Sequence, residues 1–173
     1  MNIGEYILPL FFCHKDGDEI IEDRFAGTAF FIDNEGGIAT CGHIIDRLKP
    51  GQILCAMYMQ DDKVYEVCEL SRHPEIDFAI GRLNTRENKF MPYYDSEIIA
   101  GLDVQSFGFT FFEKSEGEIT ITPRLSRGYI TRVYDQPETM GSMSTCETSF
   151  PSLNGYSGAP VYTLGESPKV IGM

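Results

Sequence analysis

One serine in this chain stands in a setting that suits a nucleophile. Ser157 lies in the segment 154–160, NGYSGAP, between two glycines and ahead of a proline. A serine hydroxyl needs a neighbouring base and backbone N–H groups directed at the oxyanion that forms on attack. Glycine suits such a segment because it has no Cβ and can adopt a positive φ. Ordinary turns use the same residue types, so the chain must also supply a histidine and an acid.

Three histidines are candidates for the base. His14 lies in a polar turn and His73 precedes a proline, so we expect both to be solvated. His43 follows the apolar run 37–40, and Gly42 before it allows the chain to bend so that the imidazole faces out of the end of a barrel. Taken alone, His43 fits a buried structural histidine and a general base equally well.

Asp77 is the best candidate for the acid beside His43. It lies between a turn and the apolar residues 78–80, so we expect its carboxylate to point towards the interior. A buried aspartate without a partner is strongly destabilising, and His43 is the natural partner. The neighbouring acidic residues are expected to be solvated: Asp46, Asp61, Asp62 and Glu75.

The elements that must position these residues are short β-strands. Apolar runs rich in Ile, Phe, Val and Tyr alternate with turn residues, which is typical of an all-β protein. Strands are predicted at 6–13, 24–33, 37–40, 52–59, 64–71 and 78–83, and again at 103–109, 117–122, 128–134, 142–149, 159–163 and 169–173. Residues 44–48 resemble a helical turn. Two small closed barrels would leave no exposed sheet edge. The predicted division is residues 1–84, a linker at 85–102, and residues 103–173.

Composition excludes several classes of partner. The chain has 173 residues, 42% of them hydrophobic and 12% aromatic, as in a globular protein. Its 26 acidic residues outnumber its 14 basic residues and give a net charge of −12, so nucleic acid and anionic membranes are poor partners. No apolar run reaches the roughly 18 residues of a membrane span, and the N-terminus lacks a signal-peptide pattern.

The cysteines indicate a reducing compartment. Five cysteines at irregular spacing, without a Cys-x-x-Cys pair, argue against a disulfide framework and against a zinc site. We therefore expect a cytoplasmic protein that uses no metal and no cofactor.

The order of the candidates along the chain is His43, Asp77, Ser157. This is the order of chymotrypsin-like peptidases, not of subtilisins or α/β-hydrolases, and residues 158–173 contain no histidine that a hydrolase would need. Four segments also resemble motifs of the trypsin-like serine peptidases, particularly their disulfide-free bacterial branch. They are GTAFFI at 27–32, TCGH at 40–43, DFAI at 77–80 and GYSGAP at 155–160. The resemblance spans nearly the whole chain.

The resemblance implies two six-stranded antiparallel β-barrels with an active site between them. It implies a serine endopeptidase that works through an acyl-enzyme, in which Ser157 attacks the peptide bond, His43 transfers the proton and Asp77 orients His43. The backbone N–H groups of Gly155 and Ser157 would form the oxyanion hole. The implied partner is a protein or peptide substrate.

Two departures from the family pattern concern activation and specificity. Tyr156 replaces the Asp or Asn that usually precedes the serine, so activation by N-terminal cleavage is not expected. Pro151 stands where a trypsin has an aspartate at the bottom of its specificity pocket, so a small or apolar substrate side chain is expected. Pro151 and Tyr156 are the predicted pocket residues.

The final residues, 170–173, resemble the strand that leads into the substrate-pairing segment of the family, which does not follow here. Either the sequence is a fragment of a longer protein, or a partner chain completes the cleft. The fragment is favoured, because an open second barrel would expose a strand edge.

Two other functions stay open on the sequence alone. One is a catalytically silent module with the trypsin fold that binds protein partners, which Tyr156 and Ala159 permit. The other is a cysteine peptidase, which is disfavoured because serine occupies the nucleophile position and Cys146 lacks flanking glycines.

Overall fold

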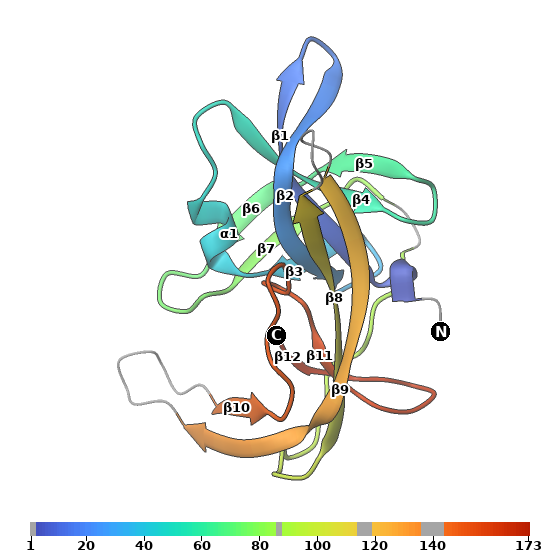
Figure 1. The fold of residues 1–173 in the computed structure, drawn as a ribbon, viewed down its shortest axis with the longest axis vertical. Coiled ribbons are helices and arrows are strands. Elements are labelled where there is room, and N and C mark those ends of the chain that lie inside the picture. The colour runs from blue at the N-terminus through green and yellow to red at the C-terminus, as the bar shows by residue number, and fades with distance from the viewer. Residues whose placement is uncertain (1–2, 86–87, 114–118, 136–143) are drawn as a thin grey trace.

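The first half of the chain forms one curled antiparallel sheet. The computed structural model describes residues 3–85, 88–113, 119–135 and 144–173. A short 3-10 helix, η1 (Ile3–Glu5), precedes seven strands: β1 (Ile7–Asp16), β2 (Glu19–Phe31), β3 (Gly37–Thr40), β4 (Gln52–Tyr58), β5 (Lys63–Glu66), β6 (Cys68–Arg72) and β7 (Ala79–Arg82). They pair in the order β5-β4-β1-β2-β3-β7-β6 (Figure 1).

The two edge strands of this sheet are β5 and β6, which are separated in the chain by a single residue, Val67. Val67 is buried and donates its N–H to the carbonyl oxygen of Leu54, in β4, at 2.8 Å. Because the edge strands β5 and β6 follow each other directly in the chain, the sheet curls until its edges approach, as in a small barrel. The single strand predicted at 64–71 is therefore bent into two, which gives seven strands in place of six.

The second half forms a five-stranded antiparallel sheet. Its strands are β8 (Asp103–Glu113), β9 (Ile119–Asp135), β10 (Ser144–Thr148), β11 (Val161–Thr163) and β12 (Val170–Gly172), in the order β10-β9-β8-β11-β12. Two predicted strands merge into β9, since the ladder with β8 continues through Pro123. Proline is tolerated there because β10 pairs only from Ile130 onwards, so among the described strands β9 has a partner on one side only at this point. The predicted strand starts at Gly117 and Ser142 lie outside the described residues.

The predicted all-β class is confirmed. The single α-helix in the described part of the chain is α1 (Gly42–Asp46), two residues earlier than the predicted helical turn. None of the described helices has the length and apolar character to span a membrane. The division of the chain into two domains joined at 85–102 stays a prediction.

A shared apolar core fixes the two sheets against each other. Phe11 and Phe25 of the first sheet belong to one buried cluster with Phe109 and Tyr162 of the second. The Phe25 and Phe111 rings also meet across the boundary, with centroids 5.6 Å apart. Burying such side chains contributes about 1.5–3 kcal/mol each. The packing therefore fixes the position of loops from the first half relative to loops from the second half.

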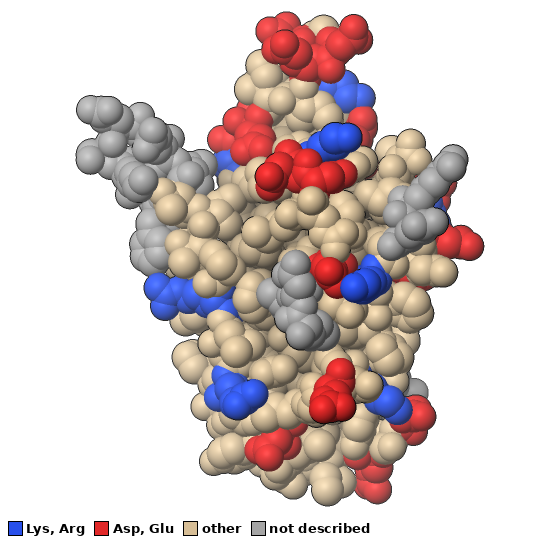
Figure 2. Space-filling view, turned by 90° about the vertical axis from the view of Figure 1, so that its right-hand side faces the viewer, with Lys and Arg blue, Asp and Glu red and all other residues tan. Residues whose placement is uncertain are grey.

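The hairpin between β1 and β2 projects from the rest of the molecule (Figure 1). It carries several acidic side chains. Asp16, Asp18 and Glu19 are exposed at its tip. The face in Figure 2 carries this acidic end, while basic and acidic side chains are interspersed over the remainder. This face offers no basic stripe for a phosphate backbone, in keeping with the net charge of −12.

Candidate active site

The structure brings three predicted residues, His43, Asp77 and Ser157, into one hydrogen-bonded chain. His43 is the second residue of α1, Asp77 lies in the turn before β7, and Ser157 lies in the loop between β10 and β11. His43 Nδ1 lies 2.7 Å from Asp77 Oδ2, and His43 Nε2 lies 3.0 Å from Ser157 Oγ. One nitrogen of the ring thus faces an acid and the other faces a hydroxyl.

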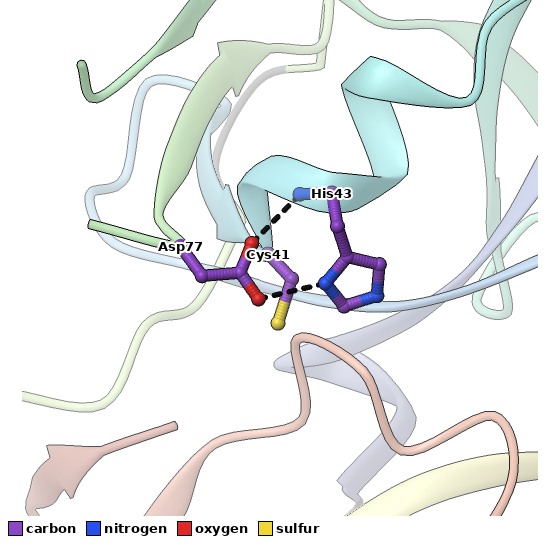
Figure 3. A group of neighbouring side chains, drawn as sticks. All are labelled: Cys41, His43 and Asp77. Atoms are coloured by element: carbon purple, nitrogen blue, oxygen red, sulfur yellow. Dashed lines mark hydrogen bonds and ion pairs between the residues drawn. The ribbon is translucent and has the colours of Figure 1, made fainter. Parts of the chain in front are cut away.

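Asp77 holds α1 at two points. Its Oδ1 accepts the backbone N–H of His43 at 2.7 Å, while Oδ2 faces the ring (Figure 3). Burial raises the pKa of the Asp77 carboxyl, but the hydrogen bonds from His43 and the nearby charges of His43 and Arg72 outweigh burial and lower that pKa overall. The carboxylate is therefore ionised at neutral pH.

The expected burial of Asp77 is wrong. Its side chain is 53% exposed, on the wall of an open cavity. The period-2 alternation of a strand does not apply to Asp77, because β7 begins only at Ala79. Two hydrogen bonds from His43 together with solvent satisfy the carboxylate, so it needs no apolar surroundings to keep its partner.

The hydrogen bonds indicate which ring nitrogen of a neutral His43 carries the proton. An ionised carboxylate can only accept, so Nδ1 must donate to Asp77. Nε2 then presents its lone pair to the Ser157 hydroxyl. This tautomer can take a proton from the serine.

The backbone before Ser157 is fixed by a tight turn. The Tyr156 N–H donates to the Leu153 carbonyl oxygen at 3.0 Å, and Gly155 has φ +97. A positive φ at the third residue of a turn is typical of type II, which strongly favours glycine there. A Cβ at Gly155 would collide with the carbonyl oxygen of Phe109. Within the described residues, no acceptor bonds to the N–H of Gly155 or of Ser157.

The glycine after the serine is equally constrained. Gly158 has φ +84, and a Cβ there would collide with the carbonyl oxygen of Thr28 and with the Thr40 hydroxyl. Both glycines of the segment NGYSGAP are thus required by close approach to other strands.

Thr28 is a positioning residue that sequence reasoning did not single out. It is fully buried in β2, and its Oγ1 donates to the Gly155 carbonyl oxygen at 2.9 Å and accepts the Phe109 N–H at 3.2 Å. Its backbone N–H donates to the Ser157 carbonyl oxygen at 2.8 Å. Thr28 therefore joins the first sheet, the second sheet and the serine loop. The available signal was a hydroxyl residue, between Gly27 and Ala29, in the otherwise apolar run 25–32.

A cavity of about 710 Å³ lies beside these residues. It is bordered by residues of both halves, and Asp77 is the one charged side chain on the described part of its wall. Of the two predicted pocket residues, Tyr156 lines the cavity, whereas Pro151 is exposed and its neighbours Phe150 and Ser152 line it instead. Tyr156 is buried, and its hydroxyl donates to the Arg124 carbonyl oxygen at 2.8 Å.

The other two histidines lie outside this site. His14 pairs with Asp23 at 2.6 Å near the exposed end of β1. His73 is exposed, and its Nδ1 accepts the Glu75 N–H at 3.2 Å. The prediction that both are solvated is confirmed.

Cys41 is a neighbour of the site that the sequence did not mark. Its side chain lies beside those of His43 and Asp77 (Figure 3). Burial raises the pKa of the Cys41 thiol to about 11, and the negative charge of Asp77 adds to the effect. The thiol is therefore protonated at neutral pH, which argues against a cysteine nucleophile here.

The chain resembles known proteins in family and in fold. A family model for the trypsin-like peptidase domain matches residues 27–173. No curated protein sequence matches the chain. The solved structure of the HtrA-type protease AlgW with a decapeptide is similar, with a TM-score of 0.64, 15% sequence identity, and coverage of 98% of this chain and 61% of that chain. Deg5 is similar with a TM-score of 0.63, 18% identity, and coverage of 98% and 84%.

These likenesses concern the fold. They confirm the chymotrypsin-like, two-barrel architecture that the sequence motifs implied. The chain spans about three fifths of the AlgW chain, of which it covers 61%.

Proposed function

The chain belongs to the family of trypsin-like peptidase domains, and we propose that it is a serine endopeptidase with Ser157, His43 and Asp77 as its catalytic triad. The observation that carries this proposal is the hydrogen-bonded chain from Asp77 through His43 to Ser157, at 2.7 and 3.0 Å. These distances lie within the range in which a base can take a proton from a nucleophile.

The proposed reaction has two halves. Ser157 Oγ attacks the carbonyl carbon of the peptide bond while its proton passes to His43 Nε2, and Asp77 stabilises the imidazolium. His43 then gives that proton to the leaving amine, and the acyl group stays on Ser157. A water molecule, deprotonated by His43, releases the acyl group as a carboxylic acid and restores the serine.

The oxyanion hole is proposed at the N–H groups of Gly155 and Ser157. The type II turn supports this, because Gly155 adopts a φ that other residues disfavour and neither N–H is used by the described residues around it. Losing one such donor typically lowers the rate by a factor of about 10² to 10³.

A peptide with a small or apolar side chain is the proposed substrate. The cavity beside the triad supports it, because no basic side chain, and no acidic one except Asp77, appears on the described part of the wall. The decapeptide in the structure of the similarly folded AlgW is consistent with a peptide ligand. A reducing, cytoplasmic location is proposed on the five free cysteines.

A fluorophosphonate probe tests the proposal, because it reacts only with an activated serine. We expect the wild-type protein to be labelled, Ser157→Ala to remain unlabelled and His43→Ala to be labelled far more slowly. Ser96→Ala is the matched control, since Ser96 is exposed, lies outside the strands and is not one of the residues that line the cavity. Absence of Ser157-dependent labelling of a folded wild-type protein would refute the catalytic assignment. Peptide binding that survives Ser157→Ala, without turnover by wild type, would then favour a binding module.

A further inference from the structure

Three different metal-ligating groups meet at the proposed triad, and two of them belong to it. The Cys41 thiol, a ring nitrogen of His43 and a carboxylate oxygen of Asp77 all lie within 4.8 Å of one another (Figure 3). Cys41 and Asp77 also line the open cavity, so an ion and its water ligand can reach them. These residues do not form a zinc-binding motif that the sequence would reveal. The fold brings Asp77 next to Cys41 and His43 from a distant part of the chain.

The geometry of the cluster is close to that of a three-ligand zinc site. With bonds of about 2.0–2.3 Å to nitrogen, oxygen and sulfur, a tetrahedral ion separates its ligand atoms by about 3.3–3.6 Å. The Nδ1 of His43 and Oδ2 of Asp77 are 2.7 Å apart and must separate by roughly 0.6 Å, while the widest pair must approach by no more than about 1.2 Å. Side-chain rotation suffices for such shifts, since Asp77 is half exposed.

Asp77 supplies the negative charge of the cluster. Arg72 lies near enough to lower the pKa of Asp77, and Arg47 follows the last residue of α1. The guanidinium of Arg72 is bonded to other groups, with its Nε 3.0 Å from Asp46 Oδ2 and its Nη1 donating to the His73 carbonyl oxygen. Among the described residues Asp77 forms its ion pair with His43, so no basic side chain pairs with the carboxylate that would bind the ion.

We propose that Cys41, His43 Nδ1 and Asp77 Oδ2 bind a zinc-class divalent cation, with water as the fourth ligand, and that this ion switches off the triad. The metal would take the place of the proton between His43 and Asp77. A neutral imidazole with metal on Nδ1 carries its proton on Nε2, so it can donate to Ser157 but cannot accept the serine proton. Binding releases one proton in total, from the thiol, because the imidazole proton moves from Nδ1 to Nε2 through solvent.

Metal binding at this site does not depend on the proposed peptidase function. Inhibition by the metal does rest on that function, so binding and inhibition are tested separately. Binding is measured by titrating the metal-free Ser157→Ala protein with Co²⁺, which gives a thiolate-to-cobalt charge-transfer absorption and the visible bands of a tetrahedral ion. We expect one Co²⁺ per chain, displaced by Zn²⁺. Introducing Cys41→Ala into the Ser157→Ala protein should weaken Co²⁺ binding at least about tenfold and abolish the thiolate absorption. Cys41→Ser, which nearly preserves the size of the side chain, should do the same.

The matched control is Cys68→Ala, which removes an exposed thiol in β6 and should leave the cobalt spectrum unchanged. Inhibition is then measured as fluorophosphonate labelling of the wild type with and without Zn²⁺. We expect saturating Zn²⁺ to suppress labelling and a chelator to restore it, and Cys41→Ser to be suppressed much less.

Each outcome separates the two proposals. A cobalt spectrum without thiolate absorption, or one unaffected by both Cys41 variants, overturns the metal site. Labelling that saturating Zn²⁺ leaves unchanged overturns the inhibition. A protein that shows the Cys41-dependent spectrum but is never labelled retains the metal site and refutes the peptidase.

Discussion

Replacing Thr28 by valine should destabilise the fold and slow the reaction of Ser157 together. Valine preserves the shape of threonine but removes the hydroxyl, which leaves the Gly155 carbonyl oxygen without its donor and the Phe109 N–H without its acceptor. Thr28 and Phe109 are buried, so water cannot easily replace these bonds. Each unsatisfied group costs about 1–3 kcal/mol. We expect a loss of about 3 kcal/mol, because the bond from Phe109, at 3.2 Å, is the weaker of the two.

Thr28→Ser is the matched control, since it keeps the hydroxyl and removes only a methyl group. It should destabilise the protein by only about 1 kcal/mol. Urea unfolding measures the stabilities, and the rate of fluorophosphonate labelling in the absence of urea measures the serine. The Gly155 turn is proposed to carry an oxyanion donor, so Thr28→Val should label more slowly by up to about 10² to 10³. Equal stability and equal labelling rates for the two variants would refute the positioning role of Thr28.

Three further predictions concern the same site. Gly155→Ala should slow labelling by about 10² to 10³ in protein that is still folded by circular dichroism, because alanine disfavours φ +97 and its Cβ meets Phe109; an unchanged rate would contradict the oxyanion assignment. Asp77→Asn should slow labelling by about 10⁴, because the amide donates to Nδ1 and moves the ring proton to Nε2, and activity close to wild type would remove Asp77 from the triad. The pKa of Asp77 is lowered in the folded protein, so its contribution to stability is present above the ordinary aspartate value of 3.8 and lost as pH falls through the folded value. As the pH falls below about 4, the urea midpoint of the wild type should therefore decrease more steeply than that of Asp77→Asn. Parallel plots of midpoint against pH would argue against a stabilising role of the Asp77 carboxylate.

The residues that the sequence could identify are those with a local signature. Ser157 stands between glycines, His43 follows a short strand through Gly42, and the order of the two with Asp77 excludes other hydrolase classes. The structure joins all three by hydrogen bonds. The fold class was predictable for the same reason, because alternating apolar runs and turn residues are local features.

The features that the sequence could not predict depend on distant pairing. Pro123 is expected to break a strand, yet β9 runs through it because β8 lies on one side and none of the described strands pairs with the other side at that point. The strand at 64–71 gave no sign of the bend at Val67, which is set by the closing of the sheet. The cluster of Cys41 with Asp77 depends on a turn 36 residues further along the chain.

The geometry of the triad is held mainly by buried groups outside it. Hydrogen-bonded pairs at exposed positions contribute little to stability, and the Asp77 side chain is 53% exposed. The rigid support is instead the buried hydroxyl and backbone of Thr28, which hold the carbonyl groups on both sides of Tyr156. Because Thr28 belongs to the first sheet and Ser157 to the second half, the distance from His43 to Ser157 is set by the packing between the sheets. The His43–Asp77 contact can therefore change, for a proton or for a metal ion, without moving the serine.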